Sequence, residues 1–274
     1  MNTPLVFITG ASSGIGQALA RACLDRGWRV ALVARRAQQL HDWLAMQSPP
    51  PAPGQAAVYP ADVCRQDQLR QAAHDCQREM GVPDLVIANA GISLGVDTSQ
   101  PEDLEVMRQV FETNVLGLAA TFQPFVEPMR QRGSGRLVAI ASVAGIRGLP
   151  GHAAYCASKA AVVSYAESLR GELRSSGVQV LTISPGYVAT PLTARNRYPM
   201  PFLMPADEFA TRALRAIERG QRHAVIPWPM ALVAVLMRCL PPALWDRLLQ
   251  GQPRKHRHRD GSATDAGAGP RDQP

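Results

Sequence analysis

The 274-residue sequence lacks several features that mark whole classes of protein. It holds only five cysteines, with no CxxC pair and no His/Cys spacing for a metal, so we expect reduced thiols and no metal site. Its apolar run Met230–Leu240 covers eleven residues, whereas a bilayer-spanning helix needs about 20. The first residues, Met1–Pro4, carry no positive charge ahead of an apolar stretch. We therefore expect no secretory signal and a cytoplasmic protein.

The sequence also lacks a stripe of basic residues interleaved with aromatic ones, the pattern typical of nucleic-acid binding. Aromatic residues make up 5% of the chain, and its net charge is +7. The basic residues are spread along the chain, and residues 251–274 carry part of the excess. We expect no nucleic-acid partner and attribute the basicity to diffuse surface charge or to a phosphate-bearing ligand.

Short apolar strands alternate with helical stretches as far as Ile226. Strands that are apolar throughout are buried on both faces, which requires helices on both sides of a parallel sheet. Right-handed crossovers then produce a doubly wound, Rossmann-type α/β fold. We predict a single domain at 1–228, an apolar extension at 229–250 and a disordered tail at 251–274. The predicted strands are Leu5–Thr9, Arg29–Ala34, Ala56–Pro60, Leu85–Ala88, Arg136–Ile140, Gln179–Ser184 and Arg222–Ile226. The predicted helices are Ile15–Arg26, Ala37–Gln47, Gln66–Met80, Glu105–Arg132, Tyr155–Ser176 and Asp207–Arg219.

A glycine-rich turn, Thr9–Gly16 (TGASSGIG), follows the first predicted strand. A strand, a glycine turn and a helix together present backbone N–H groups to a pyrophosphate. Gly10 permits the tight turn, Gly14 lets a phosphate approach the backbone, and Gly16 lets helix and strand pack closely. The turn indicates a dinucleotide site, although turns of small residues also occur for packing reasons alone.

The same turn matches a second motif, G-x-S-x-G, in which Ser12 would be the nucleophile of a hydrolase. Such an enzyme needs a late histidine, and the candidates are His152, His223, His256 and His258. Of these, His223 opens an apolar strand, and His256 and His258 lie in the predicted tail. The nucleophile turn also normally follows several strands, whereas this one follows the first. The hydrolase is kept as an alternative.

Arg35, at the end of the second predicted strand, favours NADP(H) over NAD. An NAD site places an acidic residue there for the ribose 2′-hydroxyl, whereas this chain has Ala34, Arg35 and Arg36. A guanidinium group suits a 2′-phosphate and stacks on adenine. The alternative is a pair of solvated arginines at the start of a helix.

Three further segments place polar or small residues beside this predicted cofactor site. Asp62 either caps a helix or accepts from the adenine amino group. The small residues of Ala88–Gly91 allow close backbone approach to a ribose. Asn114 is a polar residue in an apolar helix, which is consistent with a helix-pairing role or with a functional one.

Tyr155 and Lys159 are four residues apart and therefore lie on one face of a helix. A neighbouring ammonium group stabilises tyrosinate, so we expect Lys159 to lower the pKa of Tyr155 toward the range of efficient proton transfer. Ser142 follows the fifth predicted strand, where ligands bind in open α/β sheets. Its hydroxyl group is suited to hold a substrate oxygen.

In this order the motifs resemble the short-chain dehydrogenase/reductase superfamily, in its compact single-domain branch. The resemblance extends from Thr9 to about Ile226 and is highly specific. One departure is Ala88, where the family usually has a second asparagine. The matching segments are Thr9–Gly16, Asp62-Val63, Asn89-Ala90-Gly91, Asn114, Ser142, Tyr155–Lys159 and Pro185–Thr190.

The resemblance implies a catalytic tetrad of Asn114, Ser142, Tyr155 and Lys159, with Tyr155 as general acid or base. It implies that Lys159 binds the nicotinamide ribose, that Asn114 supports a water relay and that Pro185–Thr190 holds the nicotinamide. The expected activity is hydride transfer between NADP(H) and a carbonyl or secondary alcohol carbon; a catalytically idle dinucleotide-binding module is a further alternative. The expected cofactor contacts are Gly10, Ser12, Ser13, Gly14, Ile15, Gly16, Arg35, Asp62, Val63, Asn89, Ala90, Gly91, Tyr155, Lys159, Pro185, Gly186, Val188 and Thr190.

The substrate and the partners are less closely defined by the sequence. A predicted lid at about 187–205 contains Tyr198, Met200 and Phe202, which favours a hydrophobic small molecule. The apolar extension either closes the substrate pocket or packs against a second subunit, or it lies on a membrane surface with help from the basic stretch Arg254–Arg259. Burial against protein is favoured, so we expect a homo-oligomer, with peripheral membrane contact as the alternative.

Overall fold

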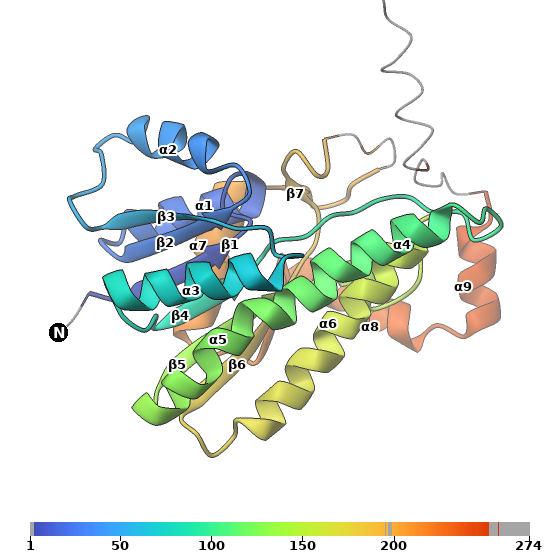
Figure 1. Cartoon of the computed structure of the whole chain (residues 1–274). Helices are drawn as coiled ribbons and strands as arrows, with labels where there is room; N and C mark the ends of the chain where they lie inside the picture. The colour runs from blue at the N-terminus through green and yellow to red at the C-terminus, as the bar shows by residue number, and fades with distance from the viewer. Residues whose placement is uncertain (1–2, 195, 197–198, 252–256, 258–274) are drawn as a thin grey trace, which may run out of the picture.

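The computed structural model describes residues 3–194, 196, 199–251 and 257. In this part of the chain a seven-stranded parallel sheet is covered by helices on both faces (Figure 1). The strand order is β3-β2-β1-β4-β5-β6-β9, and every neighbouring pair is parallel. The strands are β1 (Leu5–Thr9), β2 (Arg29–Ala34), β3 (Ala56–Pro60), β4 (Leu85–Ala88), β5 (Gly135–Ile140), β6 (Val178–Pro185) and β9 (His223–Ile226). The prediction of a doubly wound α/β fold is confirmed.

The helices form two layers, one on each face of the sheet. On one face α1 (Gly14–Leu24) packs against α7 (Ala206–Glu218), with α2 (Ala37–Ala45) at the sheet edge. On the other face lie α3 (Gln66–Met80), α5 (Gly117–Arg132) and α6 (Ala153–Glu172). A short second sheet joins β7 (Val188–Ala189) to β8 (Met204–Pro205) within the predicted lid. Tyr198 of that lid lies outside the described residues.

Strand β1 shows why the apolar runs predicted the sheet so closely. Val6 and Ile8 belong to the core cluster that contains α1 and α7, whereas Leu5 and Phe7 belong to the cluster on the opposite face. Successive side chains of a strand point to opposite faces, so a strand covered on both sides is apolar at every position. The ring of Phe7 lies 4.7 Å from that of Phe125 in α5, centroid to centroid.

The predicted helix Glu105–Arg132 is three elements in the structure. It consists of α4 (Asp103–Phe111), a π-helical turn at Glu112–Leu116, and α5, which continues through Pro124 and Pro128. A single π turn shifts the side chains that follow it around the helix axis, and such turns often occur at functional sites. Asn114 lies inside this π turn.

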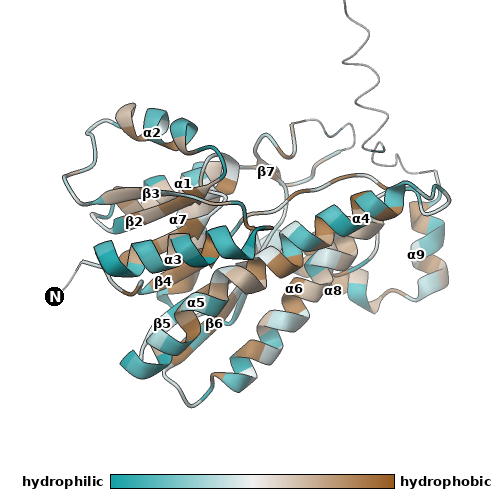
Figure 2. Cartoon of the chain, in the orientation of Figure 1, coloured by the Kyte–Doolittle hydropathy of each residue, from teal (hydrophilic) through white to brown (hydrophobic). Residues whose placement is uncertain are grey.

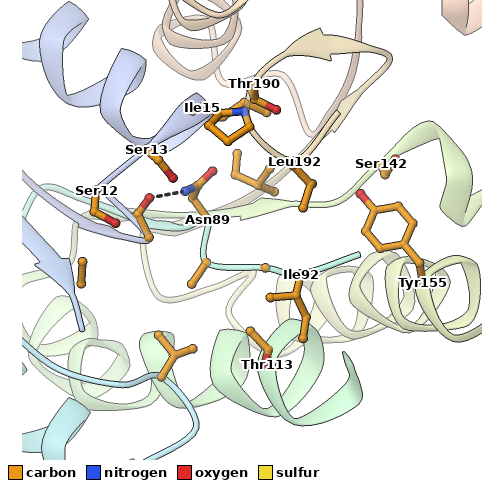
Figure 3. Close-up of a pocket in the computed structure, with 18 of the residues that line it drawn as sticks. Ser12, Ser13, Ile15, Asn89, Ile92, Thr113, Ser142, Tyr155, Thr190 and Leu192 are labelled. Carbon is orange, nitrogen blue, oxygen red and sulfur yellow. Dashed lines mark hydrogen bonds between the residues drawn. The ribbon is translucent and has the colours of Figure 1, made fainter. Parts of the chain in front are cut away.

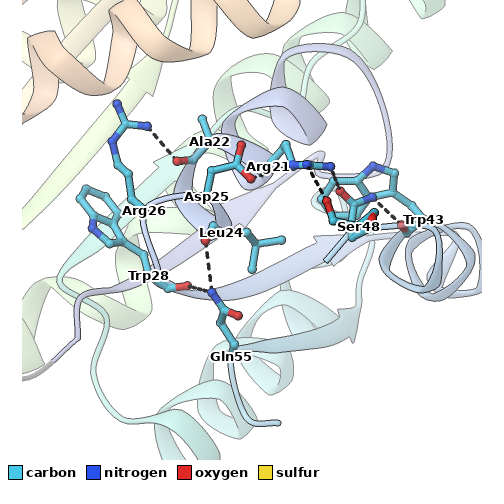
Figure 4. A network of polar contacts seen from close by, with 10 residues as sticks. Arg21, Ala22, Leu24, Asp25, Arg26, Trp28, Trp43, Ser48 and Gln55 are labelled. Carbon is cyan, nitrogen blue, oxygen red and sulfur yellow. Dashed lines mark hydrogen bonds and ion pairs between the residues drawn. The ribbon is translucent and has the colours of Figure 1, made fainter. Parts of the chain in front are cut away.

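The proline-rich connection between α2 and β3 is tied to the body of the domain. Arg21 of α1 donates to Asp25, which follows its own helix (Figure 4), and to the side chain of Gln47. Gln55 donates to the carbonyl groups of Leu24 and Trp28, each at 3.3 Å. The connection therefore belongs to the same single domain and does not separate two domains.

Two apolar helices follow β9 at one end of the molecule, α8 (Trp228–Cys239) and α9 (Pro242–Leu249) (Figure 1). Among the described residues no single helix is long and apolar enough to cross a membrane. Together α8 and α9 pass that test by length and composition, with a bend of 119° between them. Of the predicted disordered tail, Gly251 and Arg257 are described, and the remaining residues lie outside the described part of the chain.

Candidate active site

A cleft of about 820 Å³ opens at the carboxyl ends of the parallel strands. Ligands bind in this position in doubly wound sheets, beside the point where the strand order reverses, here between β1 and β4. The volume lies within the range of about 300–1,000 Å³ typical of small-molecule and cofactor sites. Figure 3 shows part of the cleft wall, from Ser12 and Ser13 after β1 to Ser142 and Tyr155.

The glycine turn after β1 is packed against the segment that follows β4. Gly10 has a φ of +67°, and a Cβ atom there would lie 2.8 Å from the Cα atom of Ala90. A Cβ atom on Gly16 would lie 2.2 Å from the carbonyl oxygen of Gly10. The Asn89 side chain donates to the carbonyl groups of Thr9 at 3.0 Å and Gly10 at 3.2 Å, and one of these hydrogen bonds is drawn in Figure 3. Asn89 therefore fixes the conformation of the turn, so that its backbone lines the cleft.

Arg35 and Asp62 lie at the far end of the cleft from Tyr155. The side chain of Arg35 is 73% exposed, and its Nη1 atom is 3.8 Å from Oδ2 of Asp62. Asp62 also accepts the backbone N–H of Cys64 through Oδ1, at 3.0 Å, and so stabilises the turn before α3. Arg36, Val63 and Cys64 line the same part of the cleft.

Tyr155 and Ser142 face each other at the other end (Figure 3). Ser142 is the N-cap of a short 3₁₀ helix, Val143–Gly145, and its Oγ atom accepts the N–H of Ala144 at 3.1 Å. Burial raises the pKa of Tyr155 above its usual value, and a hydrogen bond with Ser142 opposes this rise. The pKa of Tyr155 is therefore shifted in the direction opposite to the one expected from the Lys159 pair, because burial outweighs the hydrogen bond with Ser142. Tyr155 therefore keeps its proton at neutral pH.

Lys159 lines the cleft with 4% of its surface exposed. Its Nζ atom donates to the carbonyl oxygen of Ile140 at 2.8 Å and is 5.9 Å from the centroid of the Tyr155 ring. A Cβ atom on Gly91 would lie 3.5 Å from the same Nζ atom, so the lysine comes close to the backbone after β4. Burial lowers the pKa of Lys159 to about 8.

Asn114 lies behind the cleft wall, fully buried in the π turn. Its Oδ1 atom accepts the N–H of Ile92 at 2.8 Å, and its Nδ2 atom donates to the carbonyl of Ile92 at 2.9 Å. Nδ2 also donates to Oγ of Ser158 at 3.0 Å. Asn114 thus fixes Ile92, which forms part of the cleft wall.

The structure brings nearly all of the predicted site residues to one cleft. Of that set, Gly16 and Asn114 do not line the cleft but pack directly behind it. Sequence reasoning missed Ser158 and Gly145, which support the site from behind. A Cβ atom on Gly145 would lie 2.7 Å from the carbonyl carbon of Lys159, so only glycine allows this approach. Ser158 could have been suspected because it shares a helix with Tyr155 and Lys159.

The alternative of a hydrolase with Ser12 as nucleophile finds no support in this geometry. Ser12 lines the cleft, but none of the described residues around the cleft is a histidine. The Nε2 atom of His223 instead makes a hydrogen bond of 2.9 Å with Ser184. Within the described part of the chain, no group of three or more His, Cys, Asp or Glu side chains could hold a metal ion.

Comparison with known proteins agrees with this fold. The family model "short chain dehydrogenase" matches residues 4–200. An uncharacterized oxidoreductase of Myxococcus xanthus is 40% identical over 248 residues, which cover 90% of this chain and 96% of the relative. Dehydrogenase/reductase SDR family member 7B of Bos taurus is 33% identical, with 92% of this chain and 82% of the relative covered.

Solved structures resemble the chain over most of its length. A short chain dehydrogenase from Burkholderia cenocepacia, in complex with NADP, has a TM-score of 0.78 at 25% identity and covers 90% of this chain and 98% of its own. A Burkholderia phymatum protein in complex with NAD has a TM-score of 0.77 at 24% identity, with 93% and 98% covered. The cleft and its glycine turn define a dinucleotide-binding α/β protein. The chain belongs to the short-chain dehydrogenase/reductase family of oxidoreductases.

Proposed function

We propose that this protein transfers hydride between NADP(H) and the carbonyl or secondary alcohol carbon of a small hydrophobic substrate, with Tyr155 as its proton-transferring residue. One observation carries the proposal. The hydroxyl group of Tyr155 faces Ser142 inside a cleft whose other end holds the glycine turn and Arg35 (Figure 3). A dinucleotide bound on the glycine turn would bring its nicotinamide toward Tyr155.

The shape of the cleft fits a dinucleotide. The glycine turn precedes α1, so backbone N–H groups at a helix N-terminus are available to a pyrophosphate, while Gly91 and Lys159 lie close together where a ribose would bind. Pro185, Gly186, Val188 and Thr190 form the wall after β6 and would hold the nicotinamide ring. When bound, the nicotinamide supplies or accepts the hydride.

Tyr155 is suited to give a proton to a substrate oxygen. Its raised pKa keeps it protonated at neutral pH, so it is a proton donor when a carbonyl group is reduced. Ser142 would hold the same oxygen through its hydroxyl group and orient it toward Tyr155. The ammonium group of Lys159, on the next helical turn, would stabilise the tyrosinate that remains after the proton has left.

Arg35 supports the choice of NADP(H). Its exposed guanidinium group lies at the cleft end beside a single nearby carboxylate, Asp62, and Arg36 lines the same region. A 2′-phosphate placed there would make charge-assisted hydrogen bonds with the guanidinium group. The solved neighbours bind NADP in one case and NAD in another, so the preference proposed for this chain rests on its own arginine.

The residues near Tyr155 favour a hydrophobic substrate. Ile92 and Leu192 project into the cleft on the side of Tyr155 (Figure 3). Apolar walls with a few polar groups are typical of sites that bind apolar small molecules. Assembly as a homo-oligomer and a cytoplasmic location stay predictions, which sedimentation and cell fractionation would check.

The test replaces Tyr155 with phenylalanine, which removes the hydroxyl group and keeps the ring. With NADPH and a panel of hydrophobic aldehydes and ketones, we expect turnover to fall by at least about 100-fold, the low end of general acid catalysis. NADPH binding, followed by nicotinamide fluorescence, should persist. Tyr165→Phe is the matched control, because Tyr165 lies on the same helix but does not line the cleft. Near-normal turnover in Tyr155→Phe would contradict the proposed mechanism.

A further inference from the structure

Helices α8 and α9 carry an exposed apolar surface that the proposed activity does not use. Trp228, Leu232, Val235 and Leu236 of α8 are each between 62% and 67% exposed. Their spacing of four, three and one residues places them on one face of the helix. Leu244 and Leu248 of α9, 45% and 53% exposed, are also four residues apart. These six side chains are called the C-terminal apolar surface below.

The opposite side of α8 is packed firmly on the domain. Met230 and Ala234 are 4% and 6% exposed and belong to the described core. A Cβ atom on Gly186 would lie 3.0 Å from Cγ of Met230, so the helix touches the segment that follows β6. The helix is therefore anchored by one apolar face and presents a second one outward. Figure 2 shows the apolar colouring of α8 at this end of the molecule.

The loop after Ser142 holds both helices in place. Nη1 of Arg147 donates to the carbonyl groups of Met237 and Leu240 at the end of α8. The guanidinium group of Arg147 lies 5.1 Å from the centroid of the Trp245 ring in α9. Nε1 of Trp245 donates to the carbonyl of Gly148 at 3.1 Å. The C-terminal apolar surface is thus linked to the two segments, 142–148 and 186–188, that flank Tyr155.

The net positive charge of the C-terminal region favours a lipid bilayer over a second copy of the chain as the partner of this surface. Residues 228–259 contain six basic side chains and one acidic one, Asp246, so they hold an excess of five in a chain whose net charge is +7. Pairing of two copies through this region would bring two such excesses together. Anionic lipid attracts the same charges, and each basic residue near the surface strengthens binding by about fivefold. The basic residues are Arg238, Arg247, Arg254, Lys255, Arg257 and Arg259; Arg257 is paired with Asp103, so an excess of four remains available to a partner.

The dimensions of the two helices suit a position on a bilayer rather than across it. At 1.5 Å per residue, the twelve residues of α8 extend about 18 Å, less than the roughly 30 Å of a hydrocarbon core. The bend of 119° before α9 turns the chain back. Arg238 and Arg247, near the ends of the two helices, are exposed and available to lipid phosphates.

We propose that the C-terminal apolar surface binds the face of an anionic lipid bilayer. The six apolar side chains enter the boundary between headgroups and acyl chains, and the exposed Arg238 and Arg247 contact the phosphates. Because Arg147 and Met230 fix α8 to the walls of the substrate site, bound protein holds that end of the cleft close to the lipid. At that position the cleft can take hydrophobic substrates from the bilayer, an inference that rests on the proposed function. The binding of the protein to the bilayer does not rest on it.

The experiment uses the purified full-length chain and vesicles of phosphatidylcholine with about 30% phosphatidylserine. We expect the protein to sediment with these vesicles, to bind pure phosphatidylcholine less, and to be released as salt rises. The double variant Leu232→Glu/Leu236→Glu should lower the partition coefficient by at least about 30-fold. Met46→Glu is the control, since this side chain is 74% exposed at the end of α2, and it should bind as the wild type does.

Two further measurements separate this proposal from the alternatives. NADPH oxidation with a soluble aldehyde should be the same for the double variant and the wild type, so that loss of vesicle binding and loss of enzyme function are distinguished. Equilibrium sedimentation should give both proteins the same oligomeric state. The proposal is overturned if the wild type does not bind anionic vesicles, or if the double variant binds them equally. It is also overturned if the substitutions dissociate an oligomer, because a second copy would then be the occupant.

Discussion

Burial of Lys159 makes the stability of the protein depend on alkaline pH in a calculable way. The pKa of Lys159 is lowered from 10.5 to about 8 because the ammonium group lies in the interior, with the carbonyl of Ile140 as its hydrogen-bond partner. Between these values the unfolded chain holds the proton and the folded chain does not. Stability therefore rises with pH across this window, and the gain is lost as pH falls through about 8.

The magnitude follows from proton linkage. For a single titrating group, a change of one pH unit alters the free energy of unfolding by at most about 1.4 kcal/mol. With the two pKa values above, a change from about pH 7.5 to about pH 9.5 should raise the free energy of unfolding by about 2 kcal/mol through this lysine alone. Other titrating groups add their own contributions, so a variant is needed as the reference.

Lys159→Met keeps the length of the side chain and removes the titrating group. Urea unfolding of both proteins at the two pH values, followed by the fluorescence of the four tryptophans, measures the difference. We expect the wild type to gain about 2 kcal/mol relative to Lys159→Met at the higher pH, since groups common to both proteins cancel. A difference that does not change with pH would refute the reasoning, because Lys159 would then keep an ordinary pKa in the folded protein.

Three further substitutions test other parts of the site. Arg35→Ala should weaken NADPH binding by about 1.5–3 kcal/mol and leave NADH binding nearly unchanged, as measured by fluorescence titration; equal losses would contradict the 2′-phosphate assignment. Gly16→Ala should abolish binding of both cofactors, because its Cβ atom would lie 2.2 Å from the carbonyl oxygen of Gly10; a variant with wild-type affinity would show that the turn adapts. Arg257→Ala should lower the free energy of unfolding by about 1–3 kcal/mol in urea, because Arg257 makes two hydrogen bonds to the carboxylate of Asp103, which is 2% exposed. Arg257→Lys should recover part of that loss, and an unchanged Arg257→Ala would mean that the ion pair does not stabilise the fold.

Local chemistry explains why the sequence determined the sheet and most of the cleft. The strand β2 was predicted with the bounds found in the structure, because a strand buried on both faces must be apolar at each position. The glycine turn was recognisable because Gly10 must adopt a positive φ and Gly16 must leave room for a backbone oxygen. Tyr155 and Lys159 could be placed together because their spacing is that of one helical turn.

The tertiary structure alone decided the features that depend on contacts between distant segments. The π turn that carries Asn114 is invisible in hydrophobic periodicity, since one inserted residue changes the direction of a side chain without changing the composition. The direction of the pKa shift of Tyr155 depends on how deeply the ring is buried, and the sequence pair of Tyr155 and Lys159 indicated the opposite direction.

The apolar extension illustrates the same division. The sequence determined that residues 229–250 are apolar and too short to cross a bilayer in one helix. Only the folded chain showed that Met230 and Ala234 are buried while Leu232 and Leu236 remain exposed. Apolar residues occupy almost every position of α8, so its sequence does not distinguish the face that packs from the face that stays open. The face of α8 that becomes buried is determined by the surface of the domain on which the helix packs.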